Sequence, residues 1–148
     1  MRLVIACDHG GLALKNTLKE MLAGSGHELL DIGTHTEESV DYPDFGKLAA
    51  EMVAGGEVER GILICGTGIG MSITANKIDG IRAALCWNTD LARLSRMHND
   101  ANILVLAGRF TAAPYAIDIA KTWLSTSFEG GRHQNRIDKL IKIEGERS

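Results

Sequence analysis

A glycine-rich stretch, Gly66-Thr67-Gly68-Ile69-Gly70, has the residue types and spacing of an anion-binding loop. It follows the apolar run from Gly61 to Cys65 and precedes a helical pattern that reaches about Lys77, so it joins a predicted strand to a predicted helix. Backbone N–H groups at such a junction point toward a ligand, the helix dipole adds positive potential, and glycine lets the backbone approach closely. The pattern favours an anion site, and a plain tight turn is the alternative.

The same stretch does not match three familiar phosphate-binding loops. A dinucleotide fingerprint needs G-x-G-x-x-G, normally after the first strand, whereas this loop is G-x-G-x-G after the third. A Walker loop, G-x-x-x-x-G-K-[ST], is absent from the sequence. A cysteine phosphatase needs an arginine in the loop after Cys65, and the stretch to Ile73 contains none. A nucleotide-binding module is therefore disfavoured.

Cys65 is the first candidate for a catalytic side chain because it ends a strand directly before the glycine loop. A helix N-terminus can lower a thiol pKa from about 8.5 to between about 3.5 and 7.5, and the thiolate can then act as a base or a nucleophile. A buried core cysteine is the alternative, and position alone does not decide between them. Cys7 and Cys86 also end predicted strands, but no glycine loop follows either, so both are interpreted as core residues.

Two further polar clusters follow predicted strands. Asp8-His9-Gly10-Gly11 comes after the first strand, and Arg109 comes after the fifth. Ligands of open α/β sheets bind outside the carboxyl ends of the strands. We therefore expect the fold to gather these clusters beside the glycine loop.

Two groups on predicted helices each allow a plain and a functional interpretation. His98 and Asn99 close a helix before the fifth strand, where a histidine can simply complement the helix dipole. Arg132, His133 and Arg136 share one face of the last helix. That spacing suits either a solvated basic face or a phosphate clamp, since guanidinium groups match phosphate oxygens.

The pattern of apolar residues predicts an α/β fold. Apolar, β-branched runs predict five strands, at residues 2–7, 27–32, 61–65, 81–86 and 102–107. Helical spacing predicts helices that begin at Leu12 and Pro43, a helix that follows the glycine loop, and helices over 89–97, 112–124 and 132–143. This alternation favours a three-layer sandwich, with a five-stranded parallel sheet and helices on both faces. Residues 1–148 are assigned to one domain, and the C-terminal helix, which no strand follows, suits contact with a neighbouring subunit.

The composition is that of a soluble globular protein. Of the 148 residues, 45% are hydrophobic and 24% are charged, and the net charge of -3 argues against nonspecific nucleic-acid binding. No segment approaches the roughly 20 apolar residues that span a bilayer, and the run that ends at Cys7 is too short for a signal peptide, so we expect a cytoplasmic protein without membrane contact. The 3 cysteines form no C-x-x-C pair, and no residue cluster has metal-ligand spacing, so neither disulfides nor a metal site are expected.

Five segments in collinear order cover nearly the whole chain: CDHGG, DYPDF, GILICGTGIGMSITANK, LSRMHNDANILVLAGR and EGGRHQNRI. Together they resemble the ribose-5-phosphate isomerase B family, which includes galactose-6-phosphate isomerase subunits. The resemblance implies a Rossmann-like fold and a homodimer, sometimes a tetramer, whose active sites are shared between two subunits. It also implies interconversion of ribose 5-phosphate and ribulose 5-phosphate through an enediolate, without metal or organic cofactor.

The resemblance implies roles for individual residues. Cys65 is the implied base that moves a proton between the first two sugar carbons, while Thr67 and His98 are implied to assist opening of the sugar ring. The implied holders of the enediolate oxygen are the backbone groups of Gly66, Gly68, Ile69 and Gly70. The implied contacts to sugar hydroxyls are Asp8, Tyr42 and Asn99. The implied phosphate ligands, some of them from the second subunit, are His9, Arg109, Arg132 and Arg136.

The sequence also narrows the branch of the family that the chain resembles. One branch lacks the cysteine and has a glutamate inside the glycine loop, where this chain has Met71, so the chain resembles the cysteine branch. Allose 6-phosphate, galactose 6-phosphate and a tetrose phosphate are the alternative substrates, because pocket depth decides the sugar. A non-catalytic sugar-phosphate sensor would be expected to lose Cys65 or His98, and both are present.

Overall fold

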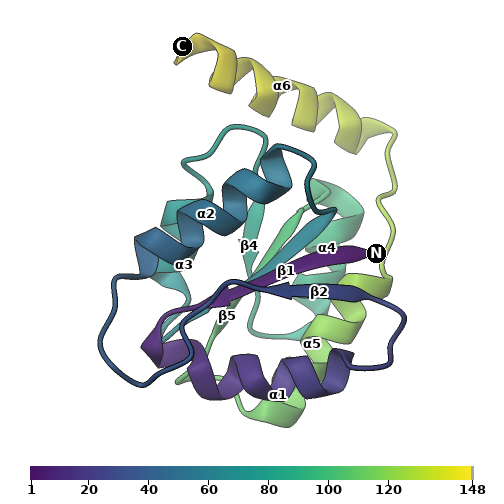
Figure 1. Ribbon diagram of the computed structural model, residues 1–148. Coiled ribbons are helices and arrows are strands. Elements are labelled where there is room, and N and C mark those ends of the chain that lie inside the picture. The colour runs from purple at the N-terminus through teal and green to yellow at the C-terminus, as the bar shows by residue number, and fades with distance from the viewer. Residues whose placement is uncertain (148) are drawn as a thin grey trace.

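The computed structural model describes residues 1–147 and shows the alternating α/β order that the sequence predicts (Figure 1). The strands are β1 (Arg2–Cys7), β2 (Glu28–Asp31), β3 (Arg60–Cys65), β4 (Ala83–Leu85) and β5 (Ile103–Ala107). The helices are the short 3-10 helix η1 (His9–Gly11), α1 (Leu12–Leu22), α2 (Tyr42–Ala54), α3 (Ile69–Ala75), α4 (Thr89–Asn99), α5 (Ala113–Ser125) and α6 (Arg132–Glu146).

The two edge strands and one helix are shorter than predicted, and β5 begins one residue later than predicted, at Ile103. β2 occupies only residues 28–31 of the expected 27–32, and β4 only 83–85 of the expected 81–86. Both lie at an edge of the sheet, where each has a single neighbour with which to pair. α3 ends at Ala75 rather than near Lys77, and the Asn76 side chain instead bonds both backbone groups of Ala83, at 2.9 and 3.0 Å.

The strand order β2-β1-β3-β5-β4 sets where a ligand is expected to bind. All neighbouring strands are parallel. From β1 the chain crosses to β2 on one side, whereas from β3 it crosses to β4 and β5 on the other. The direction of winding therefore reverses between β1 and β3, and ligands of α/β proteins bind at the carboxyl ends of strands at such a switch point.

Each face of the sheet carries its own apolar core. Helices α1, α4 and α5 pack on one face, against Ile62 and Ile64 of β3. Helices α2 and α3 pack on the other face, against Leu63 and Cys65 of the same strand. Alternate residues of a strand point to opposite faces, so the pleat of β3 directs Cys65 toward α2 and α3. The predicted three-layer Rossmann-like sandwich is confirmed.

Helix α6 lies outside these layers. Figure 1 shows it in yellow at the top, beyond α2 and far from α1. Only His133 and Ile137 of this helix are buried, whereas Leu140, Ile141 and Ile143 are about half exposed. No helix within residues 1–147 is long and apolar enough to cross a membrane.

A buried ion pair joins α1 to the end of β2. The fully buried Lys15 donates from Nζ to Asp31 Oδ1 at 2.9 Å and to the Thr34 carbonyl at 2.7 Å, while Lys19 donates to Asp31 Oδ2 at 2.6 Å. Burial alone would raise the pKa of Asp31. The hydrogen bonds from Lys19, Lys15 and the Gly33 N–H outweigh burial and lower the Asp31 pKa below its ordinary value.

Asp31→Asn should destabilise the protein because it leaves the Lys15 ammonium buried without a carboxylate. We expect a loss of about 3–5 kcal/mol in the free energy of unfolding at pH 7, measured by urea denaturation, as is usual when one partner of a buried pair is removed. Asp90→Asn, which removes a carboxylate from an exposed pair with Arg93, should change this free energy by less than about 1 kcal/mol.

The pH dependence of stability should change with the same substitution. Because the Asp31 pKa is lower in the folded than in the unfolded chain, its contribution is complete above the unfolded pKa of about 3.9. That contribution is lost as the pH falls through the folded pKa. Asp31→Asn should remove this part of the acid destabilisation, and equal acid dependence in parent and variant would contradict the assignment.

Gly68 forms the turn between β3 and α3. Its φ is +76°, in the left-handed region, and a Cβ there would overlap the Leu85 side chain and lie 3.2 Å from the Leu106 carbonyl. A side chain would therefore meet both conformational strain and a packed neighbour.

Gly68→Ala should therefore destabilise the protein more than an alanine substitution at a glycine that has a positive φ but no packed neighbours. Gly26 is a matched control, because its φ is +82° and a Cβ there meets nothing within 4 Å. We expect Gly26→Ala to lower the free energy of unfolding by about 1–2 kcal/mol and Gly68→Ala by about 1–3 kcal/mol more. Urea midpoints give the comparison, and equal midpoints for the two variants would show that the turn has room for a side chain.

Candidate active site

Three loops meet at the carboxyl edge of the sheet. The Gly108 N–H donates to the Cys65 carbonyl at 2.8 Å, and the Arg109 N–H donates to the Gly66 carbonyl at 3.0 Å. A Cβ on Gly108 would lie 2.6 Å from the Gly10 carbonyl oxygen, so the loop after β1 touches the loop after β5. The structure thus brings together the three polar clusters that follow β1, β3 and β5.

The glycine loop keeps several backbone donors without partners. Within residues 1–147, no hydrogen bond uses the N–H groups of Gly66, Thr67 or Gly68. The Ile69 N–H is bonded to Thr67 Oγ1 at 3.2 Å. Helix α3 has only 7 residues, so the loop's own N–H groups are the main attraction for an anion here.

Cys65 lies at the base of this loop and is 4% exposed. In the described part of the chain its thiol makes no hydrogen bond. Its burial suits either a base in a site that excludes water or a thiol of the core, so exposure alone does not separate these two roles.

The other two cysteines are core thiols, as the sequence predicts. Burial raises the pKa of Cys7 to about 11 and the pKa of Cys86 to about 11. Both thiols donate to backbone carbonyls, Cys7 to Thr34 at 3.8 Å and Cys86 to Ala84 at 3.6 Å. Neither thiol is therefore a candidate base near neutral pH.

Four predicted binding residues surround the glycine loop. The buried Asp8 accepts the Gly10 N–H at 2.9 Å, and His9 Nδ1 accepts the Val40 N–H at 3.2 Å. An imidazole that accepts at Nδ1 carries its proton on Nε2, so His9 can donate a hydrogen bond from Nε2. The Tyr42 ring covers Gly70, with ring carbons 2.7 Å from the position of a Cβ there, and Arg109 Nη1 lies 3.3 Å from the corresponding position at Gly66.

The remaining predicted site residues lie elsewhere. His98 and Asn99 end α4, which runs back across the sheet to the start of β5. Arg82, which precedes β4, donates from Nε to the Asn99 carbonyl at 3.0 Å. The 5 residues of β5 span roughly 16 Å at about 3.3 Å each. His98 therefore lies near the amino ends of the strands, whereas Cys65 lies at the carboxyl ends.

Arg132 and Arg136 lie with His98 near the amino ends of the strands. The His98 and His133 rings stack with centroids 4.2 Å apart and an interplanar angle of 12°, which ties the start of α6 to the end of α4. Among the residues that the structure describes, neither arginine forms an ion pair with a carboxylate, and the same is true of Arg109. A single chain therefore does not bring His98, Asn99, Arg132 and Arg136 to Cys65.

His133 is not part of a solvated basic face, because it is 4% exposed. Its Nε2 lies 3.3 Å from Glu129 Oε2. Burial lowers the pKa of His133, electrostatic effects of His98, Arg132 and Arg136 lower it further, and Glu129 partly offsets them. The sequence gives no signal for this arrangement, since His98 is far along the chain from Glu129.

His98, Glu129 and His133 form a cluster that the sequence does not suggest. One ligand atom from each residue lies within 4.8 Å of the others, which is a geometry that could hold a metal ion. The sequence suggests no such cluster because the segment that carries Glu129 meets α4 only in the folded chain, where the Glu129 N–H donates to the Met97 carbonyl at 3.1 Å.

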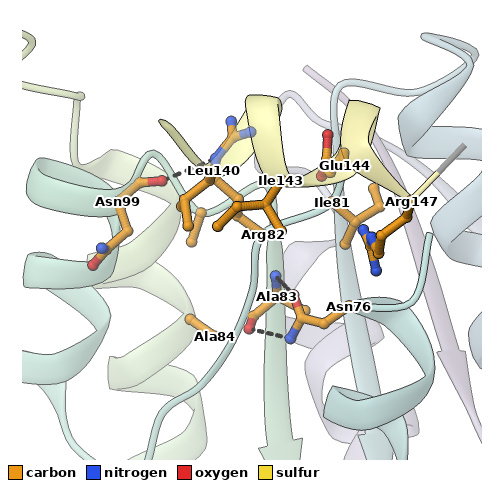
Figure 2. Close-up of a pocket in the computed structure, with 11 residues that line it drawn as sticks. Asn76, Ile81, Arg82, Ala83, Ala84, Asn99, Leu140, Ile143, Glu144 and Arg147 are labelled. Carbon is orange, nitrogen blue, oxygen red and sulfur yellow. Dashed lines mark hydrogen bonds between the residues drawn. The ribbon is translucent and has the colours of Figure 1, made fainter. Parts of the chain in front are cut away.

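A cavity of about 440 Å³ between α6 and β4 is a separate feature (Figure 2). Its walls include Ile81, Ala84, Leu140 and Ile143, and Asn99 is the only predicted site residue among them. The glycine loop and Cys65 do not border it. The cavity is therefore not the place where the candidate catalytic groups meet.

Comparisons with known proteins agree with this geometry. The chain is 45% identical over 147 residues to ribose-5-phosphate isomerase B of Escherichia coli, covering 99% of both chains. The structure of Clostridium thermocellum ribose-5-phosphate isomerase B matches with a TM-score of 0.98, at 53% identity and 100% coverage of both chains. The structure of Mycoplasma genitalium ribose-5-phosphate isomerase B with bound ribulose 5-phosphate matches with a TM-score of 0.94, at 43% identity, covering 98% of this chain and 97% of that chain.

A family-level comparison gives the same result. Residues 3–140 match the family described as Ribose/Galactose Isomerase. The match includes every predicted site residue, from Asp8 to Arg136. The chain therefore belongs to the Ribose/Galactose Isomerase family.

Proposed function

We propose that this chain is an aldose–ketose isomerase that interconverts D-ribose 5-phosphate and D-ribulose 5-phosphate. The observation that carries the proposal is the row of unpaired N–H donors at Gly66, Thr67 and Gly68, directly after Cys65. Relatives of 45% and 53% identity that match nearly the whole chain are ribose-5-phosphate isomerases B. The relative from Mycoplasma genitalium binds ribulose 5-phosphate, which supports the same ligand here.

In the proposed reaction, Cys65 acts as the carbon base. Its thiolate removes the proton from C2 of the open-chain aldose, and the electron pair moves onto the C1 carbonyl oxygen to give an enediolate. The proton then returns from Cys65 to C1, and the C2 hydroxyl proton passes to the C1 oxygen, which gives the ketose with its C2 carbonyl and C1 hydroxyl. Loop N–H groups stabilise the charge that develops on oxygen, and loss of one such donor typically costs about 2.7–4 kcal/mol of transition-state stabilisation.

The other predicted residues bind the sugar phosphate. We assign ring opening to Thr67 and His98, and contacts to sugar hydroxyls to Asp8, Tyr42 and Asn99. The phosphate ligands are His9, Arg109, Arg132 and Arg136. His9 suits this role because its Nδ1 is occupied by the Val40 N–H and its Nε2–H can donate. The three arginines suit it because no carboxylate among residues 1–147 neutralises them.

A shared site between two subunits is the second part of the proposal. Because His98 and Cys65 lie at opposite ends of the strands of one sheet, a complete site needs a second copy of the chain. That copy would supply His98, Asn99, Arg132 and Arg136. A two-fold interface would supply both sites at once. The exposed apolar residues Ile69 and Ile73 beside the loop, and Ile141 and Ile143 on α6, support such an interface. Tetramer formation, a single domain over residues 1–148 and a cytoplasmic location stay predictions.

Cys65→Ala should abolish isomerisation while the protein stays folded and still binds sugar phosphates. General-base removal typically lowers the rate by about 10²- to 10⁴-fold. The measurement is kcat/KM for ribose 5-phosphate, allose 6-phosphate, galactose 6-phosphate and a tetrose phosphate, with ribose 5-phosphate expected to give the highest value in the parent.

Cys86→Ala is the matched control for this prediction, because Cys86 is a buried thiol with no proposed catalytic role. Its turnover per folded protein should remain within a few-fold of the parent. EDTA should not inactivate the parent. Near-normal activity in folded Cys65→Ala would exclude Cys65 as the base, and loss of activity with EDTA would contradict a metal-free reaction.

Mixed dimers test the shared site. Cys65→Ala and His98→Asn homodimers should each be poor isomerases on the cyclic substrate. After subunit exchange with random pairing, half of the dimers are mixed, and one site of each mixed dimer has both residues intact, so about a quarter of all sites should recover by two-fold symmetry. The assay is isomerase activity before and after exchange. No gain despite verified mixed dimers would mean that both residues serve a site within one chain.

A further inference from the structure

Asp100 directly follows the last residues of α4, His98 and Asn99, and has an unusual backbone conformation. Its φ is +44° and its ψ is 45°, in the left-handed region, and among residues 1–147 it is the only non-glycine residue with a positive φ. Helices often end with a glycine in this conformation, because a side chain costs conformational energy there. Backbone strain of this kind clusters at functional sites, so the contacts of the Asp100 carboxylate are informative.

Two arginines from different parts of the chain bind the two oxygens of this carboxylate. Arg96 Nη1 donates to Asp100 Oδ1 at 2.8 Å and to the Ala101 carbonyl at 2.6 Å. Arg82 Nη2 donates to Asp100 Oδ2 at 3.4 Å, and its Nε donates to the carbonyls of Asn99 and Asp100 at 3.0 and 3.1 Å. A dashed line in Figure 2 marks the bond to Asn99. The guanidinium groups therefore hold both the side chain and the backbone of the turn that ends α4.

Arg96 is itself held in the protein interior. It is 5% exposed, and its Cζ lies 5.8 Å from the centroid of the Trp123 ring. Its Nε donates to the Thr126 carbonyl at 3.3 Å. The turn after α4 is therefore fixed to the buried side of α5 and to the segment that follows α5, which gives the carboxylate a rigid partner.

We propose that Asp100 is a positioning residue that, with its two arginine partners, fixes the turn after α4 and thereby orients the His98 imidazole. This inference rests on the proposed role of His98 in opening the sugar ring. Among residues 1–147 no hydrogen bond holds the His98 ring, which stacks on His133 and lies 3.9 Å from Glu129. The direction of the ring therefore depends on the backbone that carries it. A group that transfers a proton must come within about 2.6–3.2 Å of its target, so a small shift of this backbone slows the reaction.

Asp100→Gly tests this role, because glycine adopts the left-handed conformation freely but removes both ion pairs. We expect kcat for ribose 5-phosphate to fall by about 10- to 100-fold, since a displacement of about 1 Å can cost about 100-fold in rate. Competitive inhibition by inorganic phosphate should be nearly unchanged. Asp100→Asn, which tolerates the same conformation and keeps one acceptor oxygen, should lose less activity. Asp90→Asn, which removes a carboxylate from an arginine pair at the other end of α4, should keep the parent kcat.

A double variant shows whether Asp100 acts through His98. In a His98→Asn background, Asp100→Gly should cost little further kcat, whereas independent effects would multiply. If Asp100→Gly fails to fold, Asp100→Asn takes its place in each comparison.

NMR gives a readout that does not depend on activity. Nuclear Overhauser effects between the ring protons of His98 and His133, whose centroids lie 4.2 Å apart, should be present in the parent and in Asp90→Asn and should weaken in Asp100→Gly. Parental kcat in folded Asp100→Gly, multiplied losses in the double variant, or unchanged Overhauser effects would overturn the proposal. A parent without isomerase activity would instead refute the proposed function, and the Overhauser effects would then decide by themselves whether Asp100 orients His98.

Discussion

The loops at the carboxyl ends of the strands are held together by close contacts between backbones, which leave no room for side chains. A Cβ on Gly108 would lie 2.6 Å from the Gly10 carbonyl oxygen, and a Cβ on Gly10 would lie 2.9 Å from the Gly66 nitrogen. Real Cβ atoms essentially never approach so closely, so a larger residue at either position would push the loops apart. The chain neighbours of these glycines are His9, Cys65 and Arg109. Contact between bare backbones therefore sets how His9, Cys65 and Arg109 are spaced around the loop.

The buried ion pair of Lys15 and Asp31 stabilises another loop at the carboxyl ends of the strands. Lys15 binds the Thr34 carbonyl and Asp31, which fixes the start of the connection from β2 to α2. That connection carries Val40, whose N–H bonds His9 Nδ1. Lys15 and His9 thus both bond to the same connection between β2 and α2. A polar interior group is usually costly, and here it orients a segment that has no strand or helix of its own.

The sequence predicts most of the fold because its apolar runs and glycines act locally. The alternation of strands and helices, the core positions of Cys7 and Cys86, and the loop after Cys65 all follow from short patterns. The position of β4 at the sheet edge does not, because strand order depends on contacts far apart in the chain. The burial of His133 is missed for a similar reason: its neighbours on α6 are polar and exposed, and its stacking partner His98 comes from α4. Likewise, no pattern around Glu129 signals that it approaches two histidines.

The proposed two-fold assembly would explain three features of the single chain: arginines without carboxylate partners, exposed apolar residues, and the separation of His98 from Cys65. Arg109, Arg132 and Arg136 lack carboxylate partners among the described residues, and unneutralised arginines suit a phosphate better than they suit a protein surface. Ile141 and Ile143 of α6 are each about half exposed. A two-fold axis that carries α6 and the end of α4 to the glycine loop of a partner would cover the apolar residues and bring the arginines to the phosphate. The same rotation would bring His98 of one chain to Cys65 of the other. Within a single chain these two residues lie about a strand length apart. One symmetry operation would thus account for the charges, the exposed apolar residues and the separation of the proposed catalytic residues together.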